Sequence, residues 1–449
     1  MKKNIRLLED PINKLIVTLA IPLMTAAVLR TSYNFVDMIF ASRLGGVQVA
    51  SVAFVGPIFN LVSAIGVGLS AGGVSLIAKS IGERKFSEAS NYAVQLRFIA
   101  LFSSVIFCAI GLLLTSLFLP LLGLTSDLLD QSIIYTQIRF FSIPFMLIYQ
   151  LYLSFYNSQG ITNVTLKMAF IGLVGNSILN AVFIYVFNMG ISGLAYATLV
   201  TQIIQSVIII TWYHLEKHDF DLSLNIFKDK FNFKSWKRIF SVCLPLSISR
   251  GSTDFGFLLL NSIILSYGYQ IVAAFAIGNQ INSLLFGPST AIGQALTPLI
   301  AQNWGNKIVE RIKKTIKTGV LYSVVFGTLG AISLHFMRKP LCFFFAKGDM
   351  TIYTNAINYL SICSWSLIGW STFQAFSGIF NGFQKTKSTM LINMVRLWGL
   401  RIPLVLIFKF VIVIGPWGVW STMFISNMAT AVFAIIFYYK YIPKMLKTI

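Results

Sequence analysis

Residues 12–41 read INKLIVTLAIPLMTAAVLRTSYNFVDMIFA, and this run decides the fold class. It is longer than the roughly 20 apolar residues that cross a bilayer as a helix. Its second half nevertheless contains Arg30, Tyr33, Asn34 and Asp37. On insertion scales, a charged side chain at the centre of such a helix costs about 2.5–3.5 kcal/mol. The run therefore predicts a membrane helix whose charged residues have a functional role.

The composition extends this prediction to the whole chain. Of 449 residues, 56% are hydrophobic and 11% are charged, against about 25% charged in soluble domains. A soluble fold could not cover so much apolar surface. Because a membrane β-barrel needs alternating segments of about 10 residues, we expect an all-α integral membrane protein with 12 transmembrane helices. The predicted segments are 12–41, 48–79, 89–122, 131–157, 164–188, 191–215, 237–266, 270–302, 315–345, 354–381, 388–412 and 416–440.

The basic residues predict the orientation. The net charge is +21, and with the N-terminus in the cytoplasm, 24 Lys and Arg fall on the cytoplasmic side against 5 outside. Cytoplasmic loops carry this excess in membrane proteins, so nucleic-acid binding is not needed to explain it. We expect a multi-pass protein of the cell inner (plasma) membrane with both termini in the cytoplasm.

The chain also repeats itself. Shifted by 223 residues, Lys14–Gly82 aligns with Lys237–Gly305 without a gap and with 14 identities in 69 positions. This predicts an N-terminal six-helix bundle (1–215), a cytoplasmic linker (216–236) and a C-terminal six-helix bundle (237–449). An even number of spans gives both bundles the same orientation, related by a pseudo-two-fold axis along the membrane normal. Such repeats are typical of secondary transporters, and no GxxxxGK[ST] nucleotide motif occurs.

Asp37 is the first candidate for chemistry. Arg30, Tyr33 with Asn34, and Asp37 follow helical spacing, so they share one face. Intramembrane acids are functional by default, which favours a protonatable or cation-binding carboxylate, with Na⁺ as a possible ligand. Alternatively, the carboxylate reaches the outer headgroups or is neutralised by an Arg.

The seventh span holds the second membrane acid. Arg250 and Asp254 are four residues apart, which suits either a mutual pair that offsets burial or a second titrating site. Pro22 and Pro245 lie inside the first and seventh spans. Each removes a backbone hydrogen bond, so each predicts either a hinge or a static kink.

Spans five and six add neutral polar groups. Asn176 and Asn180 are four residues apart and face one way, and Thr198 and Gln202 share a face of the next span. Such groups either line a cavity, as Tyr33, Asn34, Arg30 and Gln202 would line one for a substrate, or pack helix against helix.

Several stretches resemble the multidrug and toxic compound extrusion (MATE) family of prokaryotic transporters. They are YNFVDMIFASRLG in span one, NSQG after span four, LPLS in span seven and IAQNWG after span eight. The resemblance implies export of organic, often cationic, compounds in exchange for H⁺ or Na⁺ by alternating access. It implies a small organic substrate, a coupling cation and the lipid bilayer as partners, with no other cofactor and no enzymatic reaction. We expect a monomer.

The same resemblance suggests roles for individual residues. Asp37 matches the family's coupling Asp, while Asn176 and Thr198 match its Asn and Thr. Asn180 stands where the family has an Asp, and Asn cannot titrate. Asp254 lies one residue beyond the acid that other branches carry in span seven, so that match is approximate.

A rival prediction comes from arginines within the spans. A flippase or exporter of lipid-linked or anionic substrates would use an Arg-lined central cavity. The arginines that support it are Arg30, Arg139, Arg250, Arg396 and Arg401.

Overall fold

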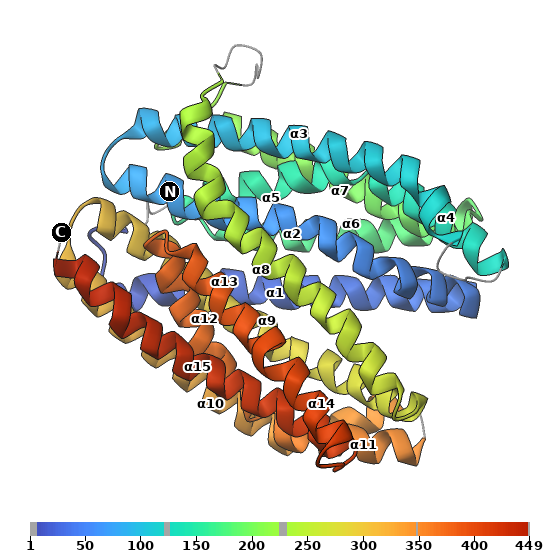
Figure 1. Ribbon diagram of the computed structural model, residues 1–449. Coiled ribbons are helices and arrows are strands. Elements are labelled where there is room, and N and C mark those ends of the chain that lie inside the picture. Colours follow the sequence, from blue (N-terminus) through green and yellow to red (C-terminus); the bar gives the residue numbers. More distant parts are fainter. Residues whose placement is uncertain (1–6, 121–125, 224–230, 347–348, 448–449) are drawn as a thin grey trace. The chain divides into compact units, whose positions relative to one another are not determined.

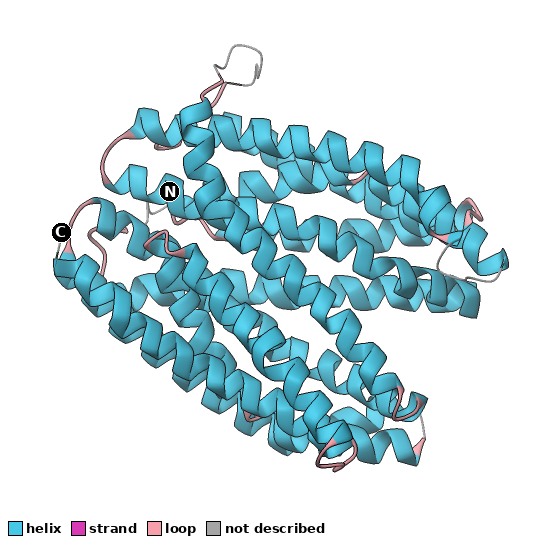
Figure 2. Ribbon diagram, viewed as in Figure 1, coloured by secondary structure: helices cyan, strands magenta, loops and turns pink. Residues whose placement is uncertain are grey.

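The computed structural model describes residues 7–120, 126–223, 231–346 and 349–447. Within these ranges every regular element is a helix and no strand occurs (Figure 2). The elements, labelled in Figure 1, are α1 (Ile12–Leu44), α2 (Gly46–Gly82), α3 (Phe86–Phe118), α4 (Ser126–Phe140), α5 (Ile143–Ser158), α6 (Asn163–Ala181), η2 (Val182–Val186), α7 (Gly190–Leu215), α8 (Phe233–Leu265), α9 (Tyr269–Gly305), α10 (Val309–Ala346), α11 (Met350–Cys363), α12 (Ser366–Gly382), α13 (Thr386–Met394), η4 (Val395–Arg401), α14 (Ile402–Phe410) and α15 (Pro416–Lys447).

The expected twelve membrane segments are present in the described residues. Four of them are composite: α4 with α5, α6 with η2, α11 with α12, and α13 with η4 and α14. Nine helices are long and apolar enough to cross a membrane, and α4 with α5, bent by 44° at their junction, makes a tenth. Two segments fall short of this test. One is α8, which carries Arg250 and Asp254, and the other is the composite of α11 and α12. The all-α fold class is confirmed.

By their contacts, the residues form two compact units. The N-unit is Thr25–Gly251, and the C-unit is Met1–Met24 with Ser252–Ile449. The predicted bundle boundaries at residues 215 and 237 follow chain order. The contacts instead assign the first half of α1 to the C-unit and the first half of α8 to the N-unit. Residues 224–230 of the predicted linker lie outside the described residues.

These exchanged helix halves pack closely within their units. In the N-unit, α8 approaches α2 at two glycines, because a Cβ on Gly68 would lie 2.6 Å from the Ser247 backbone nitrogen. A Cβ on Gly72 would lie 3.0 Å from the Cys243 Cα atom. In the C-unit, the apolar start of α1 joins one buried cluster with α9, including Leu19 and Ala295. Small residues at helix crossings let backbones approach, which is how membrane helices associate.

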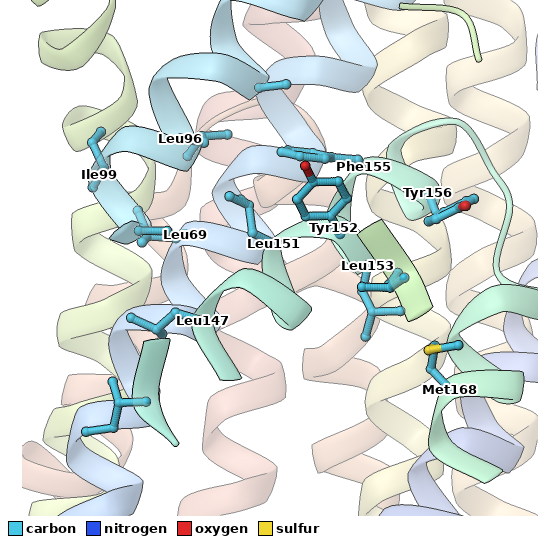
Figure 3. Close-up of a cluster of buried hydrophobic side chains, with 14 of the residues drawn as sticks. Leu69, Leu96, Ile99, Leu147, Leu151, Tyr152, Leu153, Phe155, Tyr156 and Met168 are labelled. Atoms are coloured by element: carbon cyan, nitrogen blue, oxygen red, sulfur yellow. The ribbon is translucent and has the colours of Figure 1, made fainter. Parts of the chain in front are cut away.

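The apolar core of the N-unit centres on α5. Figure 3 shows Leu147, Leu151, Tyr152 and Phe155 of this helix against Leu96 of α3, and further members come from α2 and α6. Phe155 is 0% exposed. This core fixes the helices that carry the polar residues considered below.

The backbone bears out the internal repeat. Ten described residues have positive φ, and they form five pairs separated by 223, 223, 224, 225 and 225 residues. The residue types differ within three of the pairs, so the shared feature is the turn geometry rather than the side chain. The pairs are Gly45 with Gly268, Arg84 with Lys307, Gly160 with Gln384, Asn188 with Val413, and Gly190 with Gly415.

The spacing grows by one residue twice along the chain, and the second increase falls within one pair of matched segments. The change from 224 to 225 falls after Gly160 and before Asn188 in the first half. That stretch holds η2, and its counterpart in the second half holds η4. A π-helical turn is an extra residue accommodated inside an α-helix, and such turns are frequent at functional sites. Candidate polar residues lie close to both of them.

Candidate functional site

The polar stripe of α1 belongs to the N-unit and divides into two parts. Tyr33 and Asp37 are half-buried, whereas Arg30 and Asn34 are exposed. The stripe is therefore anchored in the unit's interior at the Asp37 end.

Asp37 is joined to α6 by hydrogen bonds. The Asn180 Nδ2 atom donates to Asp37 Oδ1 at 2.8 Å and also to Asn176 Oδ1 at 2.9 Å. Asn176 and Asn180 are 1% and 0% exposed. Both Nδ2 hydrogens thus meet an oxygen, and turning the amide over would set oxygen against oxygen, so the assigned orientation is the favourable one. Asp37, Asn180 and Asn176, all predicted site residues, are therefore linked by consecutive hydrogen bonds.

The residue that stands where the family has an acid is therefore a donor. An Asp at position 180 would present a second carboxylate to Asp37, whereas Asn180 presents an N–H. Its own Oδ1 atom is buried and accepts no hydrogen bond from the described residues. An unsatisfied buried oxygen carries a desolvation cost unless a ligand or water meets it.

Thr198 and Tyr33 lie beside the hydrogen-bonded residues Asp37, Asn180 and Asn176. Thr198 is 2% exposed, and its hydroxyl donates to the Leu194 carbonyl at 3.2 Å. The Tyr33 hydroxyl is buried and lies near Thr198 and Asp37. The cluster therefore holds one carboxylate, two amides and two hydroxyls, drawn from α1, α6 and α7.

Arg139 is the neighbour that sequence reasoning did not connect with Asp37. Its guanidinium lies 4.9 Å from the centre of the Phe59 ring and 5.9 Å from that of Tyr135, over their faces. The positive charge of Arg139 interacts electrostatically with Asp37, but the two groups make no ion pair within 4 Å among the described residues. An Arg mid-way along a predicted span was the only available signal, since nothing local reveals which helix α4 faces.

The other predicted site residues are not in this network. Gln202 is half-buried, and its Oε1 atom has no hydrogen-bond partner among the described residues. Arg250 lies in the N-unit and Asp254 in the C-unit, on either side of the unit boundary within α8. Their mutual pairing stays a prediction. So does the Arg-lined central cavity, because Arg30, Arg139 and Arg250 belong to the N-unit, and Arg396 and Arg401 to the C-unit.

Both predicted hinge residues lie inside continuous helices. Pro22 is buried within α1, two residues before this helix passes from the C-unit to the N-unit. Pro245 is buried within α8, six residues before the opposite transition. The missing backbone hydrogen bond thus falls near each point where a helix changes unit.

The donor atoms at Asp37 suit a hard cation or a proton. Oxygen ligands from carboxylate, amide and hydroxyl groups are those that such cations prefer. No group of three or more His, Cys, Asp or Glu able to hold a metal occurs in the described residues. Asn180 Oδ1, which accepts no hydrogen bond from the described residues, adds a further oxygen for a cation such as Na⁺ once the amide turns toward Asp37, whereas Asp37 alone fits H⁺.

Known proteins show what this arrangement resembles. A Bacillus subtilis protein named "Probable multidrug resistance protein YoeA" is 23% identical over 435 residues, covering 94% of this chain and 92% of its own length. A Shewanella oneidensis "FAD transporter" is 24% identical, with 90% of each chain covered. A crystal structure of "MATE in complex with MaL6" matches with a TM-score of 0.94 and 24% identity over 100% of both chains.

A structure described as the outward-facing conformation of a multidrug resistance MATE family transporter also matches at a TM-score of 0.94. The MatE family profile matches residues 22–186 and again 245–407. The two matches start at Pro22 and Pro245, 223 residues apart, in agreement with the repeat. This chain therefore belongs to the MatE family and is a multi-pass membrane transporter.

Proposed function

We propose that the protein is an antiporter that exports organic cations in exchange for H⁺ or Na⁺ by alternating access. The observation that carries the proposal is the Asp37–Asn180–Asn176 chain, a membrane carboxylate held by buried amides at a π-helical segment. Intramembrane carboxylates mark ion and proton pathways. A multidrug resistance role comes from the names of relatives such as YoeA.

The coupling ion is bound at Asp37. With Na⁺, the ligands are the Asp37 carboxylate, the Asn176 and Asn180 amide oxygens and the Thr198 hydroxyl. This requires the Asn180 amide to release Asp37 and turn its Oδ1 atom inward. With H⁺, Asp37 alone takes the proton and the amides only position it.

Cation binding changes the charge of the carboxylate, and that change drives transport. An ionised Asp37 and a neutralised Asp37 have different energies in the two access states, which is the condition for coupling. The bend is taken up near Pro22, where α1 lacks a backbone hydrogen bond and changes unit. A substrate in the cavity beside Tyr33, Asn34, Arg30 and Gln202 then loses its site and leaves outward.

Export means movement away from the cytoplasm, so the proposal includes an orientation of the protein in the membrane. We infer that both termini are cytoplasmic, that the protein resides in the inner (plasma) membrane, and that it works as a monomer. The 24 to 5 distribution of Lys and Arg supports this orientation.

Everted membrane vesicles test the proposal. Uptake of a fluorescent organic cation is measured with a pH gradient alone, with a Na⁺ gradient alone, and with neither. Dependence on one gradient identifies the ion. Equal uptake without any gradient contradicts antiport.

A further inference from the structure

The C-unit contains a second buried polar cluster, which the proposed function does not use. It centres on Arg401 at the end of η4, whose side chain is 2% exposed. Its Nε atom donates to Ser426 Oγ at 2.9 Å, and its Nη2 atom donates to Asn427 Oδ1 at 2.7 Å. The Phe257 ring lies under one face of the guanidinium at 5.6 Å.

The contacts of Arg401 are all with neutral groups. Besides these three residues, its electrostatic neighbours are the Tyr359 hydroxyl and the Cys363 thiol. A guanidinium carries five N–H donors, and the bonds to Ser426 and Asn427 use two of them. Arg401 makes no ion pair with any described Asp or Glu. A buried charge without a counter-charge is strongly destabilising.

A second guanidinium converges on the same amide. Arg396 is 3% exposed, stacks over Trp370 at 4.6 Å, and its Nη1 atom lies 3.5 Å from Asn427 Oδ1. Asn427 is itself held in place because its Nδ2 atom donates to Ser366 Oγ at 3.1 Å. Two positive groups therefore share one neutral oxygen, an arrangement that an anion between or beside them would stabilise.

The repeat relates this cluster to the N-unit's cluster. At the spacing of 225 that matches Gly190 with Gly415, Gln202 falls on Asn427. Asn176 lies in the stretch where the spacing changes from 224 to 225, so it falls on Leu400 or Arg401. At the spacing of 223 that holds for the first helices, Asp37 falls on Leu260, which is 0% exposed. The position matched with Asp37 is therefore apolar in the C-unit, and the buried charge of the C-unit's cluster is a guanidinium instead of a carboxylate.

We infer that Arg401 and Arg396 form an anion subsite in the C-unit for a carboxylate or a similarly small monoanion. The planar fork of Arg401 matches a carboxylate in a bidentate geometry. The Phe257 ring lies against Arg401 and the Trp370 ring lies against Arg396, and these aromatic faces favour an aromatic carboxylate. At 2% exposure the fork is closed to solvent in this structure, so entry requires the surrounding side chains to move.

Equilibrium binding to the purified full chain tests the subsite without any transport. The probes are ¹⁴C-benzoate and ³⁶Cl-chloride, each displaced by excess unlabelled benzoate or by uncharged benzamide. We expect saturable benzoate binding that benzamide does not displace. Arg401→Gln should weaken it by about tenfold or more, as loss of a charge-assisted hydrogen bond does. Arg97→Gln removes another buried Arg, 2% exposed and in the N-unit, and serves as the control.

The two probes separate the sources of the anion. Tighter binding of benzoate assigns the subsite to organic carboxylates, and tighter binding of chloride assigns it to an inorganic ion. If Arg401→Gln does not fold, Arg401→Lys carries the test, since it keeps the charge and loses the fork. The inference is overturned if neither anion binds saturably, or if binding is the same in the wild type and the Arg401 variant. A failure of cation coupling at Asp37 would leave both results unchanged.

Discussion

The N-unit and the C-unit share one backbone plan but place opposite charges in it. In the N-unit, Asp37 accepts a hydrogen bond from Asn180. In the C-unit, Arg401 donates to Asn427, which is matched with Gln202 of the N-unit. Both clusters lie on a segment that contains a π-helical turn. The two halves thus share the positions of their turns, whereas the buried charge is negative in the N-unit cluster and positive in the C-unit cluster.

This contrast suggests a division of labour. A carboxylate binds and releases a cation, so its charge varies through a transport cycle. A guanidinium stays charged at every relevant pH, so the C-unit presents a fixed positive charge. Only the N-unit cluster is then suited to coupling, and the following experiments probe that asymmetry.

The largest effect is expected at Asp37. In the proposed mechanism the charge of Asp37 distinguishes the two access states, so Asp37→Asn should lower gradient-driven efflux by about 100-fold. Dye uptake into everted vesicles measures it, and immunoblots confirm equal protein. Asp130→Asn, at an exposed acid on α4, is the matched control. Full activity in Asp37→Asn would contradict the proposal that coupling depends on the N-unit cluster.

Helix packing supplies the next effect. A Cβ on Gly72 would lie 2.4 Å from Cys243 Sγ and 3.0 Å from its Cα atom. Gly72→Ala should therefore destabilise the N-unit by about 1–3 kcal/mol through overpacking. Thermal unfolding in detergent measures it.

Gly175→Ala is the control for that substitution, because a Cβ there meets nothing within 4 Å. In a helix interior, Ala is favoured over Gly, so this variant should be neutral or slightly more stable. Equal losses in both variants would show that the contact between α2 and α8 is looser than the distances indicate.

The donor to the carboxylate should matter less than the carboxylate. Asn180→Leu removes the 2.8 Å bond to Asp37 and leaves Asn176 without its donor, so efflux should fall by about tenfold. Asn180→Asp restores the family's acid and should bind the coupling cation more tightly. Apparent cation affinity in vesicles reports both changes, and an unaltered affinity in Asn180→Asp would argue that position 180 lies outside the cation site.

The smallest effect concerns Glu83 and its two lysine partners, which are absent from the matched positions of the second half. Glu83, in the turn after α2, lies 2.7 Å from Lys85 and 3.2 Å from Lys79. Partial burial would raise the pKa of Glu83, but hydrogen bonds from Lys85 and Lys79 outweigh it and hold the pKa below its ordinary value. The interactions of ionised Glu83 with the two lysines therefore stabilise the fold at pH values above the pKa of Glu83 in the unfolded state. This stabilisation is lost as the pH falls through the pKa of Glu83 in the folded state.

Glu83→Gln should lower the thermal midpoint at pH 7 by no more than about 2 °C. The difference from the wild type should shrink on acidification. The matched position in the C-unit is Asn306, so Asn306→Asp serves as a control that lacks this pair of lysines. A difference that grows at low pH would contradict the assignment.

The sequence by itself determined the membrane class, the twelve segments and the duplication, and it singled out Asp37 as a candidate coupling residue. These conclusions rest on hydropathy averaged over a stretch of sequence, on residue spacing, or on a single charged residue within an apolar segment. Each of these can be read without knowing which residues are neighbours in the fold. Hydropathy averaged over about 20 residues needs no knowledge of neighbours. The repeat likewise follows from spacing alone, and the five pairs of positive-φ residues bear it out.

Only the tertiary structure decided which side chains meet. The sequence placed Asn176 and Asn180 on one helix face, but their contact with Asp37 depends on how α1 and α6 are rotated against each other. The approach of Arg139 to the site and the bond from Arg401 to Asn427 depend on the same rotations. The exchange of helix halves between units was equally hidden. Apolar helices bury well in many registers, so the pairing of their few polar groups is settled by packing across the whole unit.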